Sequence, residues 1–132
     1  MKRYMLDTNT VSHLVRRHPE VSRKIVSVPM GSLCVSAITE GELLFGLAMR
    51  PEAIRLKQAV NELLRRVDVL CWDSDAAQWY GVIRAAQQRG GKALAASDLL
   101  IASHAVATEA TLVTNDSAFS YVEGLKTEDW TK

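Results

Sequence analysis

Four acidic residues from well-separated parts of the chain are its strongest candidates for chemistry. They are Asp7, Glu42, Asp98 and Asp116. Carboxylates brought together at low dielectric repel one another, so a cluster of them persists only around a positive charge. Mg²⁺ and Mn²⁺ are hard cations that prefer oxygen ligands of this kind. Zinc fits less well, because the chain offers few histidines and no closely spaced cysteine pair.

Short apolar strands alternate with amphipathic helices and would position these acids. We expect strands at residues 3–6, 33–35, 67–71 and 111–114. We expect helices at residues 8–17, from 19 onward, 39–49, 52–66, 73–89 and from 97 onward. In the second of these helices the spacing predicts that Val21, Ile25 and Val26 face inward. The alternation indicates an α/β fold built on a parallel sheet.

The acids fall where such a fold binds its ligands, at the carboxyl ends of the strands. Asp7 directly follows the first expected strand, and Asp116 comes shortly after the last one. Glu42 lies in the first turn of the helix expected at 39–49, and Asp98 lies at the start of another helix. Because helix N-termini in these folds point to the same edge of the sheet, all four carboxylates are predicted to converge there.

Each acid also fits an ordinary structural role. Asp7 can cap the helix that follows it, and Thr39 with Glu42 matches a capping box. Asp98 suits a helix N-terminus through the helix dipole, and Asp116 suits a loop. Taken one at a time, the acids favour these structural roles. Because all four are expected at one edge of the sheet, however, a functional cluster is as good a hypothesis as four separate structural roles.

The composition is that of one soluble globular domain, which we expect to span residues 1–132. Hydrophobic residues make up 48% and charged residues 23%, which excludes a disordered chain. The net charge of +1 excludes a polybasic binder, yet residues 1–66 hold 11 basic and 6 acidic residues while residues 67–132 hold 5 and 9. This division favours a basic surface for a phosphate backbone beside an acidic site.

We expect a cytoplasmic protein with no membrane role. The N-terminus reaches Asp7 before a signal-peptide core could form, and no apolar run approaches the roughly 20 residues of a membrane helix. Cys34 and Cys71 lie far apart, each in a short apolar stretch. We interpret them as free, buried thiols of a reducing compartment, and a disulfide between neighbouring strands is the alternative.

Five stretches of the chain carry a family resemblance. They are Met5-Leu6-Asp7-Thr8-Asn9, Ser36-Ala37-Ile38-Thr39 with Glu42-Leu43 and Gly46, Ser97-Asp98-Leu99-Leu100-Ile101-Ala102, Leu112-Val113-Thr114-Asn115-Asp116 with Phe119, and the closing Gly124-Leu125-Lys126 and Glu128-Asp129-Trp130. In this order and over nearly the whole chain, they resemble the PIN-domain ribonucleases, in particular the VapC toxins of bacterial toxin–antitoxin pairs. The resemblance implies a three-layer PIN-like α/β fold, with a short parallel sheet flanked by helices.

The resemblance also implies an activity, that of a Mg²⁺- or Mn²⁺-dependent endoribonuclease. Its catalytic, metal-binding acids match Asp7, Glu42, Asp98 and Asp116. The metal would activate water and offset charge at the phosphate, leaving a 5′-phosphate and a 3′-hydroxyl. Neighbouring polar side chains would bond to the acids or to metal-bound water, or would serve only as turn and cap residues; they are Thr8, Asn9, Thr114 and Asn115.

The resemblance implies several partners. The substrate would be RNA, with transfer RNA a candidate, and cleavage would inhibit translation. A VapB-like antitoxin would lie across the acidic groove and offer an Arg or Lys to the carboxylates. The chain would form a homodimer, for which helix 52–66 is a candidate face. It would meet operator DNA only through the antitoxin complex.

Two other functions remain open from the sequence. One is a non-catalytic PIN module that binds RNA or a protein partner, although all four acid positions are filled here. The other is a phosphoacceptor receiver domain, which would need a further acidic pair near Asp7. We expect no catalytic role for the histidines, since His104 lies six positions beyond Asp98 and on another face of the helix.

Overall fold

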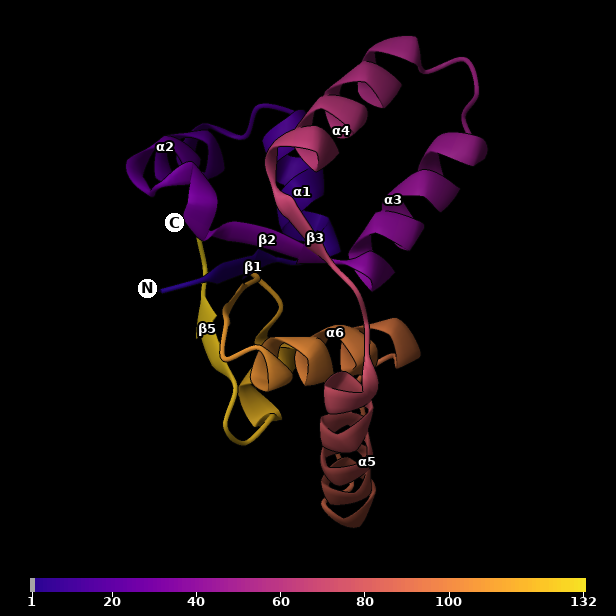
Figure 1. The fold of residues 1–132 in the computed structure, drawn as a ribbon, viewed down its shortest axis with the longest axis vertical. Helices are drawn as coiled ribbons and strands as arrows, with labels where there is room; N and C mark the ends of the chain where they lie inside the picture. The colour runs from indigo at the N-terminus through magenta and orange to yellow at the C-terminus, as the bar shows by residue number, and fades with distance from the viewer. Residues whose placement is uncertain (1) are drawn as a thin grey trace.

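A five-stranded parallel sheet forms the centre of the fold in the computed structural model, which describes residues 2–132 (Figure 1). Its strands are β1 (Tyr4–Leu6), β2 (Leu33–Ser36), β3 (Asp68–Leu70), β4 (Thr111–Val113) and β5 (Lys126–Glu128). The strand order is β3-β2-β1-β4-β5, and every neighbouring pair is parallel. The carboxyl ends of all five strands therefore share one edge of the sheet.

Helices cover both faces of this sheet (Figure 1). They are α1 (Thr8–Val15), α2 (Pro19–Ser27), α3 (Ala37–Ala48), α4 (Ile54–Arg66), α5 (Ser74–Arg89) and α6 (Ala96–Ala107), with short 3₁₀ turns η1 (Met30–Ser32) and η2 (Ser117–Tyr121). Helices α1 to α4 contribute to one hydrophobic cluster, and α5 and α6 contribute to the other. The expected three-layer α/β arrangement, with a short parallel sheet flanked by helices, is confirmed.

Alternation along the strands produces the two clusters. Met5 and Leu112 face α5 and α6, whereas their chain neighbours Leu6 and Val113 face α1 to α4. Successive side chains of a strand point to opposite faces, so strands covered on both faces are apolar at most positions rather than at alternate ones. This is why three- and four-residue strands were readable from the sequence.

Two details of the expected elements were wrong. Val26 was expected to face inward but is 81% exposed, because α2 turns only a narrow stripe around Val21 toward the core. Strand β5 was not expected, since Lys126–Glu128 is polar and lies at the edge of the sheet, where one face and one side meet water.

The start of α3 also differs from expectation. The helix begins at Ala37, and its cap is Ser36, whose hydroxyl accepts a hydrogen bond from the Ile38 N–H. Thr39 and Glu42 therefore do not form a capping box, and Glu42 lies in the second turn. Within residues 2–132, no helix is both long and apolar enough to cross a membrane.

The two cysteines are free, as expected, but only one is buried. Cys34 lies inside the sheet on β2, whereas Cys71 is exposed just after β3. The apolar stretch around Cys71 belongs to the strand before it, and the chain leaves the core at that point.

Candidate active site

Asp7 lies at the carboxyl end of β1 and is 4% exposed. Its Oδ1 accepts a hydrogen bond of 2.8 Å from the Thr10 N–H, which caps α1, and its own N–H donates to the Val113 carbonyl of β4. The Thr10 hydroxyl also donates to that carbonyl. Asp7 thus has the expected structural role, but the cap uses only one carboxylate oxygen.

Glu42 meets this edge from α3. The Thr8 hydroxyl, from the first residue of α1, donates a hydrogen bond to Glu42 Oε1. Thr8 follows Asp7 directly in the chain, so this bond joins the first two acid-bearing segments. Thr8 thus bonds to a carboxylate through its side chain, as the sequence suggested for this polar neighbour.

Asp98 enters from the first turn of α6. Partial burial raises the pKa of its carboxyl above the ordinary value, and repulsion from Asp116, Glu42 and Asp7 raises it further. The charges of three acids from other segments therefore act on Asp98 at this edge of the sheet. We refer to Asp7, Glu42, Asp98 and Asp116 as the site carboxylates.

Asp116 completes the cluster from the loop after β4 and is the most open member. Its Oδ1 accepts from the Ala118 N–H and caps η2, while its own N–H donates to Thr114 Oγ1. Thr114 therefore holds the Asp116 backbone from a buried position. Asn9 and Asn115, the other expected polar neighbours, have exposed side chains.

The donor set suits a hard divalent cation, because every candidate ligand is a carboxylate oxygen and the carboxylates repel one another. Within residues 2–132, however, no three His, Cys, Asp or Glu side chains are gathered closely enough to form a complete ligand set. The site carboxylates therefore lie near enough for the other three charges to act on Asp98, but their side chains are not gathered into one ligand set.

An apolar groove of about 290 Å³ adjoins the site between α1, α3 and α4. Thr8 and Glu42 line the end nearest the site carboxylates, and Arg16 and Arg50 also line the groove. Phe45 is 67% exposed there. The sequence analysis did not single out this groove, although apolar residues on more than one face of α3 are the signal that could have indicated it.

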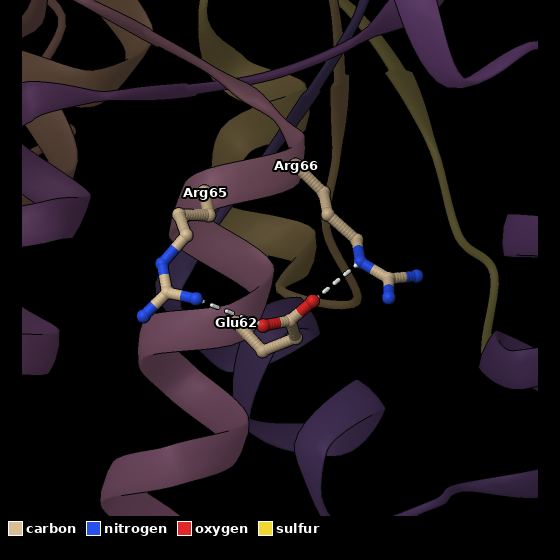
Figure 2. Close-up of polar contacts among 3 residues, drawn as sticks. All are labelled: Glu62, Arg65 and Arg66. Carbon is tan, nitrogen blue, oxygen red and sulfur yellow. Dashed lines mark hydrogen bonds and ion pairs between the residues drawn. The ribbon is translucent and has the colours of Figure 1, made fainter.

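A separate charged cluster lies on α4, in a part of the sequence that holds none of the site carboxylates. Glu62 accepts from Arg65 at 3.4 Å and from Arg66 at 2.8 Å, and all three side chains are exposed (Figure 2). We call it the α4 ion-pair cluster. Glu62 offsets one of these two positive charges, so the cluster keeps a net charge of about +1 on the exposed face of α4.

Comparison with known proteins adds to this geometry. The PIN domain family matches residues 4–125. The "tRNA(fMet)-specific endonuclease VapC" of Shigella flexneri is 34% identical over 131 residues, 98% of this chain and 99% of the relative. "Ribonuclease VapC2" of Haemophilus influenzae is 33% identical over the same shares of the two chains.

Solved structures agree in both fold and sequence. DNA-bound VapBC from Salmonella typhimurium contains a chain that superposes with a TM-score of 0.91 at 34% identity, covering 98% of this chain and 99% of the other. VapBC2 from Rickettsia felis, bound to a DNA fragment from its promoter, gives a TM-score of 0.88 at 29% identity, with 96% and 98% covered. These similarities extend over nearly the full length of each chain.

Proposed function

This chain belongs to the PIN-domain family and is a VapC-type endoribonuclease toxin, and on that basis we propose that its site carboxylates bind Mg²⁺ or Mn²⁺ and cleave RNA. The observation that carries the proposal is the placement of the site carboxylates, which come from the end of β1, from α3, from the first turn of α6 and from the loop after β4. The raised pKa of Asp98, caused by burial and by the charges of the other three acids, supports this placement. A cluster of like charges is unfavourable for folding alone, so its presence is best explained by a cationic ligand. Family membership also removes the receiver-domain alternative.

The proposed mechanism assigns tasks to the chain's own groups. A bound divalent cation supplies a water of lowered pKa and positive charge at the scissile phosphate. The Thr8 hydroxyl holds Glu42 Oε1, and the Thr10 N–H holds Asp7 Oδ1, so both carboxylates keep one orientation. A carboxylate oxygen left free by these bonds accepts a hydrogen bond from the attacking water and aligns it. Asn9 and Asn115 are proposed to reach water or phosphate from the rim.

Transfer RNA is the substrate class we propose. Relatives from Shigella flexneri and Salmonella typhimurium are named as tRNA(fMet)-specific endonucleases at 34% identity over nearly the whole chain. Exposed Arg16 and Arg50, next to Glu42 in the same groove, provide positive charge beside the acidic site. Phosphate contacts of this kind position a nucleic acid without specifying its sequence.

The groove between α1, α3 and α4 is the proposed seat of a VapB-like antitoxin. Its apolar lining, with exposed Phe45 and Met49, suits an amphipathic segment of the antitoxin. A basic side chain at the end of that segment would reach Glu42 and its neighbours and neutralise them. Inhibition would then compete directly with the metal and the RNA.

The remaining proposals concern assembly and setting. We propose that residues 1–132 act as one PIN domain, that the chain forms a homodimer and that it works in the cytoplasm. Operator DNA would be bound through the antitoxin, as in the DNA-bound complexes of the Salmonella and Rickettsia relatives.

The test is an RNA cleavage assay with antitoxin-free protein, on total RNA and on purified transfer RNA. Cleavage should require Mg²⁺ or Mn²⁺, stop with EDTA, and be lost in Asp7→Ala and Asp98→Ala. Asp75→Asn is the matched control, because Asp75 is an exposed acid in the first turn of α5 and should be dispensable. Binding of RNA without cleavage would support the non-catalytic alternative, and cleavage that survives EDTA or both substitutions would refute the metal site.

A further inference from the structure

His104 is a buried polar side chain that the nuclease chemistry does not use. It lies on α6, is 1% exposed, and its Nδ1 is 2.7 Å from the hydroxyl of Ser36, which is itself fully buried. Ser36 is the last residue of β2 and the cap of α3. The bond therefore connects two helices that are distant in sequence, α6 and α3, at the point where α3 begins.

The proton in this bond can be assigned by counting donors. The Ser36 oxygen already accepts the Ile38 N–H, and its single hydroxyl proton is free to donate. Burial lowers the pKa of His104, although Asp73 and the Cys71 backbone oppose this by favouring the charged ring. The ring is thus neutral near pH 7, and its Nδ1 accepts from the Ser36 hydroxyl.

The two helices joined here are those that carry Glu42 and Asp98. Helix α3 packs on α6, and the Glu42 charge acts unfavourably on Asp98. Repulsion between these carboxylates tends to separate α3 from α6. A buried hydrogen bond between the same helices opposes that separation, and it is strongest where water is excluded.

We propose that His104 is a positioning residue, whose hydrogen bond to Ser36 holds the start of α3 against α6 and so sets the spacing between Glu42 and Asp98. The inference rests on the proposed function of the site carboxylates. His104 itself touches neither RNA nor metal, since its ring is enclosed between the two helices.

Two conservative variants separate a positioning role from simple packing. In His104→Asn, the amide oxygen falls near the Nδ1 position and can still accept from Ser36. In His104→Gln, the amide lies farther along the side chain, near the Nε2 position, and the bond to Ser36 is lost. Gln87→Leu is the matched control, because Gln87 is a buried polar residue of α5 whose bond to the Tyr121 carbonyl joins neither α3 nor α6.

The measurements are kcat and KM for RNA cleavage, Mn²⁺ affinity by calorimetry and the midpoint of thermal unfolding. We expect His104→Gln to lower kcat and Mn²⁺ affinity about tenfold, the usual scale for groups behind metal ligands, with KM changed less than about twofold. His104→Asn should recover most of both losses, and Gln87→Leu should lose stability alone. Ser36→Ala should match His104→Gln in kcat and Mn²⁺ affinity but lose more stability, because it also removes the cap of α3. Combining the two substitutions should add little to the losses of kcat and affinity.

Specific outcomes would overturn the inference. One is a kcat and an Mn²⁺ affinity in His104→Gln that equal those of the wild type. Another is that His104→Asn, His104→Gln and Gln87→Leu all lose kcat and Mn²⁺ affinity in proportion to the fall in their thermal unfolding midpoints. If His104→Gln does not fold, the Mn²⁺ affinity of Ser36→Ala decides: wild-type affinity in that variant overturns the inference, because it lacks both the bond to His104 and the cap of α3. Failure of the proposed function is a different result: the wild-type protein itself would neither cleave RNA nor depend on Asp98.

Discussion

The site carboxylates and the α4 ion-pair cluster use charge in opposite ways. In the α4 ion-pair cluster, Glu62 is satisfied by Arg65 and Arg66 within one exposed helix (Figure 2). At the sheet edge, four carboxylates come from separate segments, and Asp98 feels the other three as like charges. Across residues 2–132, the ion pairs include none of the site carboxylates.

The contrast separates charges that serve the fold from charges kept for a ligand. Exposed pairs such as those on α4 are neutralised locally and contribute little to stability. The charge of Asp98 interacts unfavourably with the three other acids, and the hydrophobic core on both faces of the sheet compensates for that cost. Breaking one cluster should therefore affect function, whereas breaking the other should slightly affect stability.

The largest expected effect is that of Asp98→Asn. We expect RNA cleavage to fall by more than about a hundredfold, beyond the loss typical of groups behind the metal ligands. Without metal, the thermal unfolding midpoint should rise by roughly a few degrees, because one repelling charge is gone. Cleavage rates and thermal unfolding followed by circular dichroism measure the two effects.

Asp75→Asn is the control for this substitution, since it removes an exposed acid from the first turn of α5. It should leave activity and stability unchanged. A fall in stability of Asp98→Asn together with its activity would mean that Asp98 serves the fold, as Glu62 does.

Metal addition should give the next largest effect. Mg²⁺ or Mn²⁺ at about 100 times its dissociation constant should stabilise the folded wild-type protein by about 2.7 kcal/mol, because the ion binds the folded state. Thermal unfolding with and without EDTA checks this shift. Asp98→Asn should show most of the shift lost, whereas Glu62→Gln should retain it; equal shifts in both variants would place the bound metal elsewhere.

A smaller effect is expected from pH, through His104. The pKa of His104 in the folded protein is lowered from the ordinary 6.5, because burial disfavours the charged ring. The neutral ring therefore contributes fully to stability above about pH 6.5. That contribution is lost as the pH falls toward the lower pKa of the folded protein, since the unfolded chain takes up the proton first. From about pH 7.5 to about pH 5.5, metal-free wild-type protein should lose more stability than His104→Asn.

The comparison with His104→Asn isolates this group, because the other histidines and the carboxylates are common to both proteins. Protonation of Asp98 acts in the other direction, since its raised pKa means that repulsion is relieved as the pH falls. If stability changes with pH in the same way in the two proteins, burial does not keep His104 neutral in the folded protein.

The smallest effect is expected from Glu62→Gln. Removing this partner of Arg65 and Arg66 should cost about 0.5 kcal/mol at low salt, within the range of exposed ion pairs, and leave cleavage unchanged. Urea unfolding at low salt and at about 0.5 M salt measures the pair, and the difference from wild type should vanish at high salt. A loss of cleavage in Glu62→Gln would remove the distinction between the two clusters.

Much of the fold was predictable because its signals are local. Strands covered on both faces show short runs of apolar residues, and helices repeat their apolar residues along one stripe. Strands β1, β2, β3 and β4 and the helices were therefore anticipated within a few residues. Strand β5 carries no such signal, because an edge strand remains partly in water. The inward orientation of Val26 was wrong for a related reason: periodicity predicts an apolar stripe but not its width.

The sequence by itself determined which acids the chain offers. It also determined that two of them follow a strand and that two lie in the N-terminal half of a helix. Only the tertiary structure decided that Asp98 feels the other three acids, that Thr8 bonds to Glu42 and that His104 meets Ser36. This is because the local pattern of apolar and polar residues indicates only which face of a helix or strand is buried. Contacts between side chains distant in sequence depend on how the elements pack, which no local pattern contains.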